Sequence, residues 1–168
     1  MRAVYYDEKG GKHNLLNGEV LIPISVMDIY MAASATAPTG TVIPTDTWTV
    51  TMEPAALYSK KPTVLTDGSS DTNLYLAGNT TVIVDMGKKE AITGLQIASG
   101  SYTASYPASI SLYSSDDKTN WKELSGVWAW GNAQWANYLT LKSLSTRYIK
   151  IEVTAAKYKL LSEIKIYK

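Results

Sequence analysis

The chain has 168 residues, with 16 basic and 15 acidic side chains and no cysteine. The near-zero net charge and the lack of a basic stripe argue against a nucleic-acid partner. The missing cysteine excludes disulfides, thiolate metal sites and a cysteine nucleophile. The aromatic residues are 12 Tyr and 5 Trp with no Phe, so every ring carries a polar group. Such rings favour core margins and clefts, and they suggest a surface that stacks on a ligand.

The first 40 residues are predicted to be an N-terminal extension or the remnant of an upstream domain. Val4–Tyr6 and Glu19–Ile24 are rich in apolar residues and flank a turn at Gly10–Gly11, which predicts a hairpin. Two strands alone are marginal in water, so this part either packs on the main domain or belongs to something larger. The stretch 32–45 is small, polar and punctuated by Pro and Gly, which predicts a linker.

Alternation of apolar and polar residues dominates the chain from residue 46 to residue 168. It is clearest in Thr81–Met86, Ile110–Tyr113, Tyr148–Val153 and Ile164–Tyr167. Short alternating runs separated by Gly, Asn, Asp and Ser are typical of strands in a sandwich or barrel. The sequence therefore predicts an all-β domain over residues 46–168, and no apolar run is long enough to span a membrane.

Six short motifs follow one another in this domain: Trp48–Val50, Val64–Thr72, Val82–Lys88, Ile110–Trp121, Arg147–Ile151 and Leu161–Tyr167. Each is weak alone, but together, in this order and spacing, they resemble the discoidin family. That family is also called the coagulation factor V/VIII type C domain, and it includes the family-32 carbohydrate-binding modules. The resemblance implies an antiparallel jelly-roll β-sandwich of about eight strands. Two positions depart from the pattern: Lys118 replaces the usual turn glycine, and Leu74 the usual Trp.

The turn at residues 67–72 gathers hard oxygen donors, which are the ligands that Ca²⁺ prefers. The resemblance implies one structural calcium ion, held by Asp67, Thr72, Glu163 and the backbone carbonyls of Leu65 and Ser70. Such an ion would join the first and last parts of the domain. The alternative is a turn closed by Asx-type hydrogen bonds, with Glu163 solvated.

Two loops, residues 99–106 and 127–138, carry the rings and planar polar groups that sugar sites use. The expected ligand-binding residues are Trp128, Trp130, Asn132, Gln134, Trp135, Tyr102 and Tyr75. Other readings stay open: Trp128 and Trp130 share strand parity and could both be buried, and Trp135 could pack beneath a loop. Trp121 is expected in the core. The Arg and His of many galactose-binding relatives are missing from these loops, so galactose specificity is not implied.

The resemblance implies a non-catalytic carbohydrate-binding or adhesion module of an exported bacterial cell-surface protein. Its partner would be a glycan or polysaccharide, with further domains in a larger polypeptide. The expected localisation is extracellular, cell-surface or periplasmic, with no export signal in this chain. The alternative is a protein- or membrane-interaction domain that uses the same loops. An enzyme is not expected, because the neighbouring Asp116 and Asp117 cannot flank one glycosidic bond, and one His with no Cys leaves no nucleophile–base pair.

Overall fold

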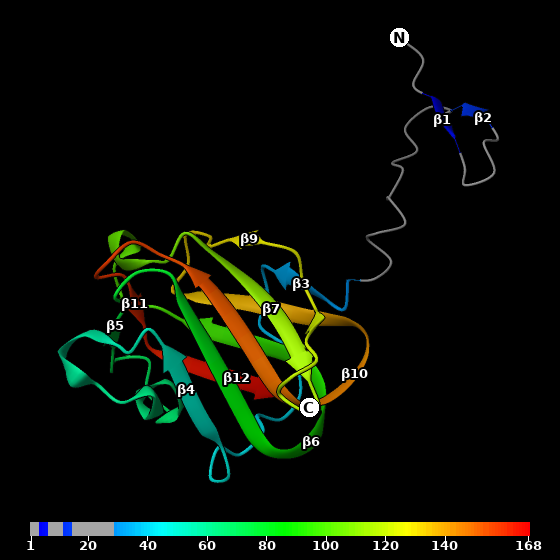
Figure 1. Cartoon of the computed structure of the whole chain (residues 1–168). Coiled ribbons are helices and arrows are strands. Elements are labelled where there is room, and N and C mark those ends of the chain that lie inside the picture. Colours follow the sequence, from blue (N-terminus) through cyan, green and yellow to red (C-terminus); the bar gives the residue numbers. More distant parts are fainter. Residues whose placement is uncertain (1–3, 7–11, 15–28) are drawn as a thin grey trace.

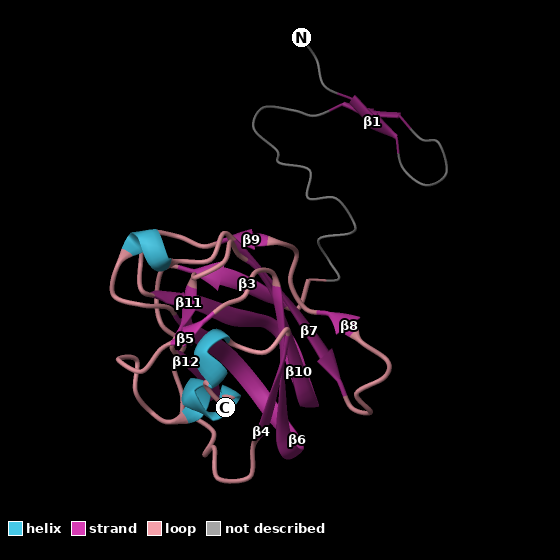
Figure 2. Cartoon of the chain, turned by 60° about the vertical axis from the view of Figure 1, so that its left-hand side comes forward, coloured by secondary structure: helices cyan, strands magenta, loops and turns pink. Residues whose placement is uncertain are grey.

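The structure, a computed structural model, describes residues 4–6, 12–14 and 29–168 (Figure 1). In the last of these ranges the strands are β3 (Met31–Ser34), β4 (Thr49–Glu53), β5 (Leu74–Tyr75), β6 (Thr80–Ala98), β7 (Ser109–Ser115), β8 (Lys122–Glu123), β9 (Trp128–Ala129), β10 (Trp135–Thr154), β11 (Leu160–Leu161) and β12 (Glu163–Tyr167). The short 3₁₀ helices η2 (Leu57–Ser59), η3 (Pro62–Thr66) and η4 (Thr103–Ser105) lie in connecting loops (Figure 2). No helix of the described residues is long and apolar enough to cross a membrane.

The strands form two antiparallel layers because β6 and β10 are long and both bend. The pairing of β10 with β6 shifts register between Leu139 and Leu144 and again between Thr146 and Tyr148. In layer one, the first half of β6 and the second half of β10 lie between β4 and β7. In layer two, the other halves lie between β12 and β3. The predicted all-β, antiparallel jelly-roll sandwich is confirmed.

The core lies between the layers and follows the alternation in the sequence. Layer one contributes its inward positions, which include Val82, Val84, Leu112, Ile149 and Ile151. Layer two contributes Leu95, Ile97, Tyr138, Ile164 and Ile166. All ten are at most 2% exposed, and successive side chains of a strand point to opposite faces. Burial of these apolar side chains drives the two layers together.

Strand pairing gathers the loops at two opposite ends of the sandwich. Ala98 pairs with Trp135, and Thr80 with Val153, so the loops at residues 76–79, 99–108, 130–134 and 155–159 share one end, called here the loop end. Asp85 pairs with Tyr148, which pairs with Ser115. The bends of β6 and β10 and the turn 116–121 therefore share the other end, called here the bend end. Any ligand site built from loops 99–106 and 127–138 must lie at the loop end.

The N-terminal part differs in detail from the sequence expectation. β1 (Val4–Tyr6) pairs with β2 (Lys12–Asn14), while Glu19–Ile24, the expected partner strand, lies outside the described residues. Strand β3 begins at Met31, runs into the stretch 32–45 expected to be a linker, and pairs with β10. Met31 and, within that stretch, Ile43 are buried, at 1% and 2% exposed. The sandwich thus takes in residues upstream of 46, because those two side chains fill its core.

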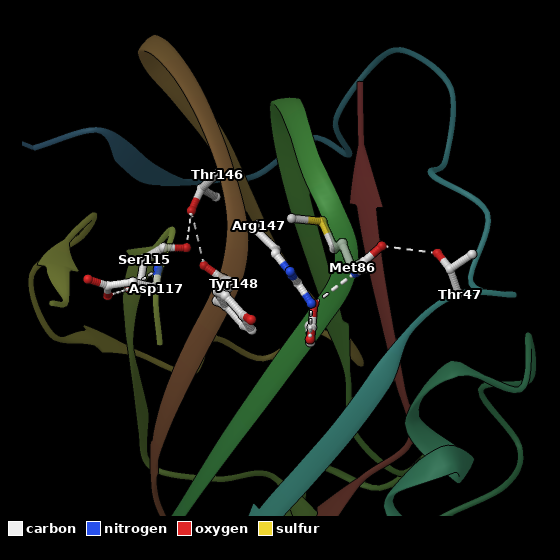
Figure 3. A network of polar contacts seen from close by, with 9 residues as sticks. Thr47, Met86, Ser115, Asp117, Thr146, Arg147 and Tyr148 are labelled. Atoms are coloured by element: carbon white, nitrogen blue, oxygen red, sulfur yellow. Dashed lines mark hydrogen bonds and ion pairs between the residues drawn. The ribbon is translucent and has the colours of Figure 1, made fainter. Parts of the chain in front are cut away.

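An ion pair stabilises the bend end. Arg147 on β10 donates from Nε and Nη2 to the two carboxylate oxygens of Asp85 on β6, at 2.9 and 3.0 Å (Figure 3). The backbone N–H of Gly87 donates to the same carboxylate at 2.8 Å. The hydrogen bond from Arg147 holds the pKa of Asp85 below its usual range. Burial opposes this shift, and the hydrogen bond from Gly87 adds to it.

The Asp85–Arg147 pair predicts a loss of stability in acid. Because the pKa is lowered in the folded chain, the stabilisation is fully present above about pH 4, the usual pKa of an unfolded aspartate, and disappears as the pH falls below it. Asp85→Asn is expected to be less stable than the wild type at pH 7, and the difference is expected to shrink as the pH falls below about 4. Urea midpoints measured across this range test this, with exposed Asp46→Asn as control. A difference that does not change with pH would contradict it.

Candidate functional site

The two loops predicted to carry the ligand site are joined in the structure. The backbone N–H of Ser99 donates to the Gln134 carbonyl at 2.9 Å, and the Gln134 side-chain amide donates to the Ser99 carbonyl at 3.2 Å. The ring of Tyr106 lies 6.0 Å from that of Trp130. Gln134 therefore uses its amide N–H to hold the loops together.

Two of the three clustered tryptophans support the loop from beneath. Trp128 and Trp130 are half-buried and pack against the core. The indole N–H of Trp130 donates to the Ala133 carbonyl at 3.0 Å. The indole N–H of Trp128 is enclosed and has no hydrogen-bond partner in the described part of the chain. Trp128 and Trp130 are two residues apart, and both rings face inward and pack against the core.

Trp135 lies differently. It begins β10, its neighbour Ala136 packs against the core, and its own ring lies on the outer face of layer two. The ring is half-buried and lines a cavity of about 340 Å³, called here the Trp135 cleft. The rest of the lining is mostly small residues from β3 and the residue after it, from β9 and from the loop before β10: Ala33, Ser34, Ala35, Ala129, Gly131 and Ala133. Small neighbours leave the ring accessible from the cleft.

A hydrogen-bond chain places an amide beside that ring. Asn137, two residues after Trp135, also lines the cleft. Its Oδ1 accepts from Gln96 Nε2 at 2.7 Å, and Gln96 Oε1 accepts from the hydroxyl of Tyr167. This chain fixes the orientation of the Asn137 amide, whose Nδ2 makes no hydrogen bond within residues 29–168. From β12, which pairs with β6, Lys165 places its Nζ 4.7 Å from the Trp135 ring centroid.

Asn137 and Gln96 were not among the ligand residues predicted from the sequence. The signal was available: strand side chains alternate, so Asn137 must share the outer face with Trp135. The pairing that adds Gln96 and Lys165 to the same row joins three strands far apart in sequence. Only the folded sheet reveals that row.

The other predicted ligand residues do not line the Trp135 cleft. Tyr102 is 78% exposed at the loop end. Tyr75 is 39% exposed and lies edge-on to Tyr58, with ring centroids 5.4 Å apart and Tyr58 70% exposed. Asn132 is exposed in the loop before β10. Tyr102, Tyr75 and Asn132 therefore lie outside the Trp135 cleft.

The predicted metal residues come together around the turn after η3. The hydroxyl of Thr72 donates to Asp67 Oδ2 at 2.7 Å, and the backbone N–H of Ser69 donates to Asp67 Oδ1 at 2.9 Å. Glu163 approaches from β12, where its Oε2 accepts from the backbone N–H of Gly68 at 3.2 Å. Leu65 and Ser70 belong to the same segment. Asx-type bonds thus do close this turn, but Glu163 is not solvated.

Glu163 is a carboxyl group in an unfavourable place for a negative charge. It is 2% exposed and lines a cavity of about 210 Å³ beside Gly68 and Thr66. Burial, and then the nearby charge of Asp67, raise the pKa of Glu163 to about 7. No group of three or more His, Cys, Asp or Glu gathers in the described residues. Any cation here would depend on two carboxylates, a hydroxyl and carbonyl oxygens, which are donors that suit calcium.

Comparisons with known proteins agree with this architecture. A family 32 carbohydrate-binding module from Clostridium perfringens NanJ, solved with galactose, superposes with a TM-score of 0.64 at 14% identity, over 76% of this chain and 98% of that one. A second C. perfringens family 32 module, solved with GalNAc-β-1,3-galactose, gives 0.61 at 14% identity, over 76% and 100%.

A chitosan-binding module from a Paenibacillus chitosanase/glucanase gives a TM-score of 0.64 at 18% identity, over 77% of this chain and 100% of that one. No curated protein matches significantly. The family profile of the F5/8 type C domain matches residues 47–164, which is most of the chain. The chain therefore belongs to the F5/8 type C, or discoidin, domain family.

Proposed function

We propose that this chain is a non-catalytic carbohydrate-binding module whose ligand lies in the Trp135 cleft. One observation carries the proposal: the half-buried ring of Trp135 lines a cavity beside the oriented amide of Asn137. An aromatic face packs against the apolar face of a pyranose, and a fixed amide donates to its hydroxyl groups. The cavity of about 340 Å³ is of the size that small ligands occupy.

The structural neighbours support the sugar class and the setting. They include modules solved with galactose and with GalNAc-β-1,3-galactose, and one that binds chitosan. We infer that this chain binds a glycan or polysaccharide as part of an exported bacterial protein, outside the cell or in the periplasm. Asp117, one of the two neighbouring carboxylates of the sequence, is fully used as a turn cap, which favours a binding role over catalysis.

Trp135→Ala is expected to weaken saccharide binding by roughly 30-fold, because truncating a central Trp costs about 2 kcal/mol of binding energy. A glycan array that includes galactose- and chitosan-type oligosaccharides identifies the ligand, and calorimetry measures the affinity. The matched control is Tyr158→Ala, an exposed ring outside the cleft. Equal affinity of Trp135→Ala and the wild type would contradict the proposed site, and binding to no saccharide would contradict the function.

The exposed tyrosines favour a second candidate function, contact with a protein or membrane. Tyr58, Tyr75, Tyr102 and Tyr158 are among the most exposed large side chains of the described residues, and Tyr and Trp rings suit surfaces that are apolar at one end and wet at the other. Co-sedimentation with liposomes separates the two candidates. Binding that survives Trp135→Ala and is lost in Tyr102→Ala would support this second function.

We also propose that a calcium ion binds between Asp67 and Glu163. The two carboxylates, the Thr72 hydroxyl and the carbonyls of Leu65 and Ser70 would hold it. The supporting observation is the buried Glu163 carboxyl facing Asp67, since a divalent cation would offset both the burial and the repulsion. When bound, the ion would connect the turn after η3 to β12 and stabilise the fold, with no part in chemistry.

A further inference from the structure

A second cavity lies at the bend end, opposite the loop end. It measures about 470 Å³ and is called here the bend-end pocket. Its walls come from three separate parts of the chain: Tyr30 before β3, residues 114–122 from β7 to β8, and residues 143–146 of β10. All of its lining residues except Leu144 carry a polar group, whereas small apolar side chains dominate the Trp135 cleft.

The walls of this pocket are firmly held. Asp117 accepts hydrogen bonds from the backbone N–H groups of Asn120 and Thr119 at 2.7 and 2.8 Å. Together with hydrogen bonds from the side chains of Asn120 and Ser115, they keep the pKa of Asp117 well below its usual range. The Thr146 hydroxyl donates to the Ser115 carbonyl at 2.7 Å and links the turn to β10 (Figure 3). Backbone bonds from Tyr30 to Leu124 and from Leu141 to Tyr30 fix the third wall. The pocket therefore exists before any ligand arrives.

A serine on the inward face of β7 lines this pocket. Ser114 follows Ile110 and Leu112 on the inward face of β7, where an apolar residue is expected. It is 5% exposed and lines the pocket, and its hydroxyl makes no hydrogen bond within the described residues. A hydroxyl that lines a pocket and is not used within the protein can bond to a ligand.

The charges of the pocket are unequally compensated. Asp116 is paired with Lys89 at 2.6 Å, and Asp117 is used within its turn. Lys122, in the pocket lining, and Lys142, beside it, converge on Tyr30, with their Nζ atoms 3.8 and 4.9 Å from its ring centroid. Lys122 Nζ also donates to the Tyr30 hydroxyl. Neither ammonium group has a carboxylate partner among the described residues. Asp117 has no cationic partner in the part of the chain that the structure describes, so the ammonium groups of Lys89, Lys122 and Lys142 stand against the two carboxylates of Asp116 and Asp117. The pocket and its rim therefore carry a net positive charge.

We propose that the bend-end pocket is a second saccharide site, selective for sugars that carry a carboxylate, such as uronic acids. The ligand carboxylate would pair with Lys122 and Lys142, and its hydroxyls would bond to Ser114, Ser143 and Ser145. Hydroxyl-rich walls match a polyhydroxylated ligand, and the two ammonium groups that the described residues leave without a carboxylate partner select a negative one. This site is independent of the Trp135 cleft and does not require that cleft to bind sugar.

The test is an NMR titration of the ¹⁵N-labelled 168-residue chain with trigalacturonate and, separately, with the neutral galactotriose. Trigalacturonate is expected to shift the amides of residues 114–122 and 143–146, and galactotriose to leave them unchanged. Lys122→Gln is expected to weaken trigalacturonate binding by roughly tenfold, the effect of one lost charged hydrogen bond. Ser114→Val, which fills the pocket, is expected to abolish it.

Two controls separate this site from the proposed function. Trp135→Ala is expected to bind trigalacturonate as the wild type does, and Lys157→Gln, an exposed lysine at the loop end, is expected to have no effect. If Ser114→Val does not fold, the trigalacturonate affinity of Lys122→Gln, a substitution at an exposed position, still tests the proposal. Unmoved amides at the pocket, equal shifts with both sugars, or binding lost in Trp135→Ala would each overturn the proposal.

Discussion

Calcium is expected to raise the melting temperature of this chain by about 5–10 °C over its value in chelator. An ion at 100 times its dissociation constant adds about 2.7 kcal/mol to the stability of the folded state. For a domain of this size each kcal/mol corresponds to about 2–4 °C. The physical reason is local: Glu163 is buried against Asp67, and a cation between them removes a repulsion that the folded chain otherwise carries. Scanning calorimetry in calcium and in chelator measures the shift.

Two variants show whether the ion acts through these carboxylates. Asp67→Asn and Glu163→Gln are each expected to abolish the calcium shift. In chelator, Glu163→Gln is expected to be at least as stable as the wild type, because it removes the charge that burial disfavours while its amide oxygen can still accept from Gly68. Glu123→Gln, on exposed β8, is the matched control. Identical melts of the wild type in calcium and chelator, with no bound ion by elemental analysis, would show that the turn holds no calcium.

The sequence was sufficient to predict the sandwich because its signal is local. Alternation marks the inward residues of β6, β7, β10 and β12 whatever their partners, and the order of motifs adds the topology. The same alternation places Lys150 on the outer face, between the buried Ile149 and Ile151. Trp121, expected in the core, lies half-buried with Lys150 Nζ 5.2 Å from its ring centroid. Trp121 lies just before β8, which has only two residues. So short a strand shows no alternation from which the side of the sheet that Trp121 faces could be predicted.

The parts that the sequence did not predict depend on long-range pairing. Most of β3 falls in the stretch 32–45 of linker composition, and it forms a strand because the edge of β10 offers it hydrogen bonds and the core accepts Met31. The bend-end pocket needs Tyr30, the turn 116–121 and the bend of β10, which are close only in the folded chain. In the candidate site, the sequence indicates Trp135 as a possible ligand-stacking ring. Its accessibility could not be predicted, because it depends on the small side chains that β3 places beside it.

A single glycine in layer two shows how strongly such pairing constrains the fold. Gly94, in the middle of β6, pairs with Leu139 and Tyr167, and Pro38 lies directly on it. A Cβ atom at Gly94 would lie 2.4 Å from the Cβ atom of Pro38 and 2.9 Å from the Tyr138 carbonyl oxygen. The proline ring is rigid, and its segment is held by bonds between Thr41 and Lys168. Neither neighbour can move without displacing a strand or this segment.

Gly94→Val is therefore expected to lower the free energy of unfolding by about 3 kcal/mol, at the upper end of the usual cost of overpacking. The matched control is Gly126→Val, since a Cβ atom at Gly126 meets nothing within 4 Å. Adding Pro38→Gly to Gly94→Val should recover part of the loss, because neighbouring sites that clash are not additive. Urea titration of the four proteins measures these differences. If Gly94→Val is as stable as Gly126→Val, the packing of Pro38 on β6 does not constrain the sandwich.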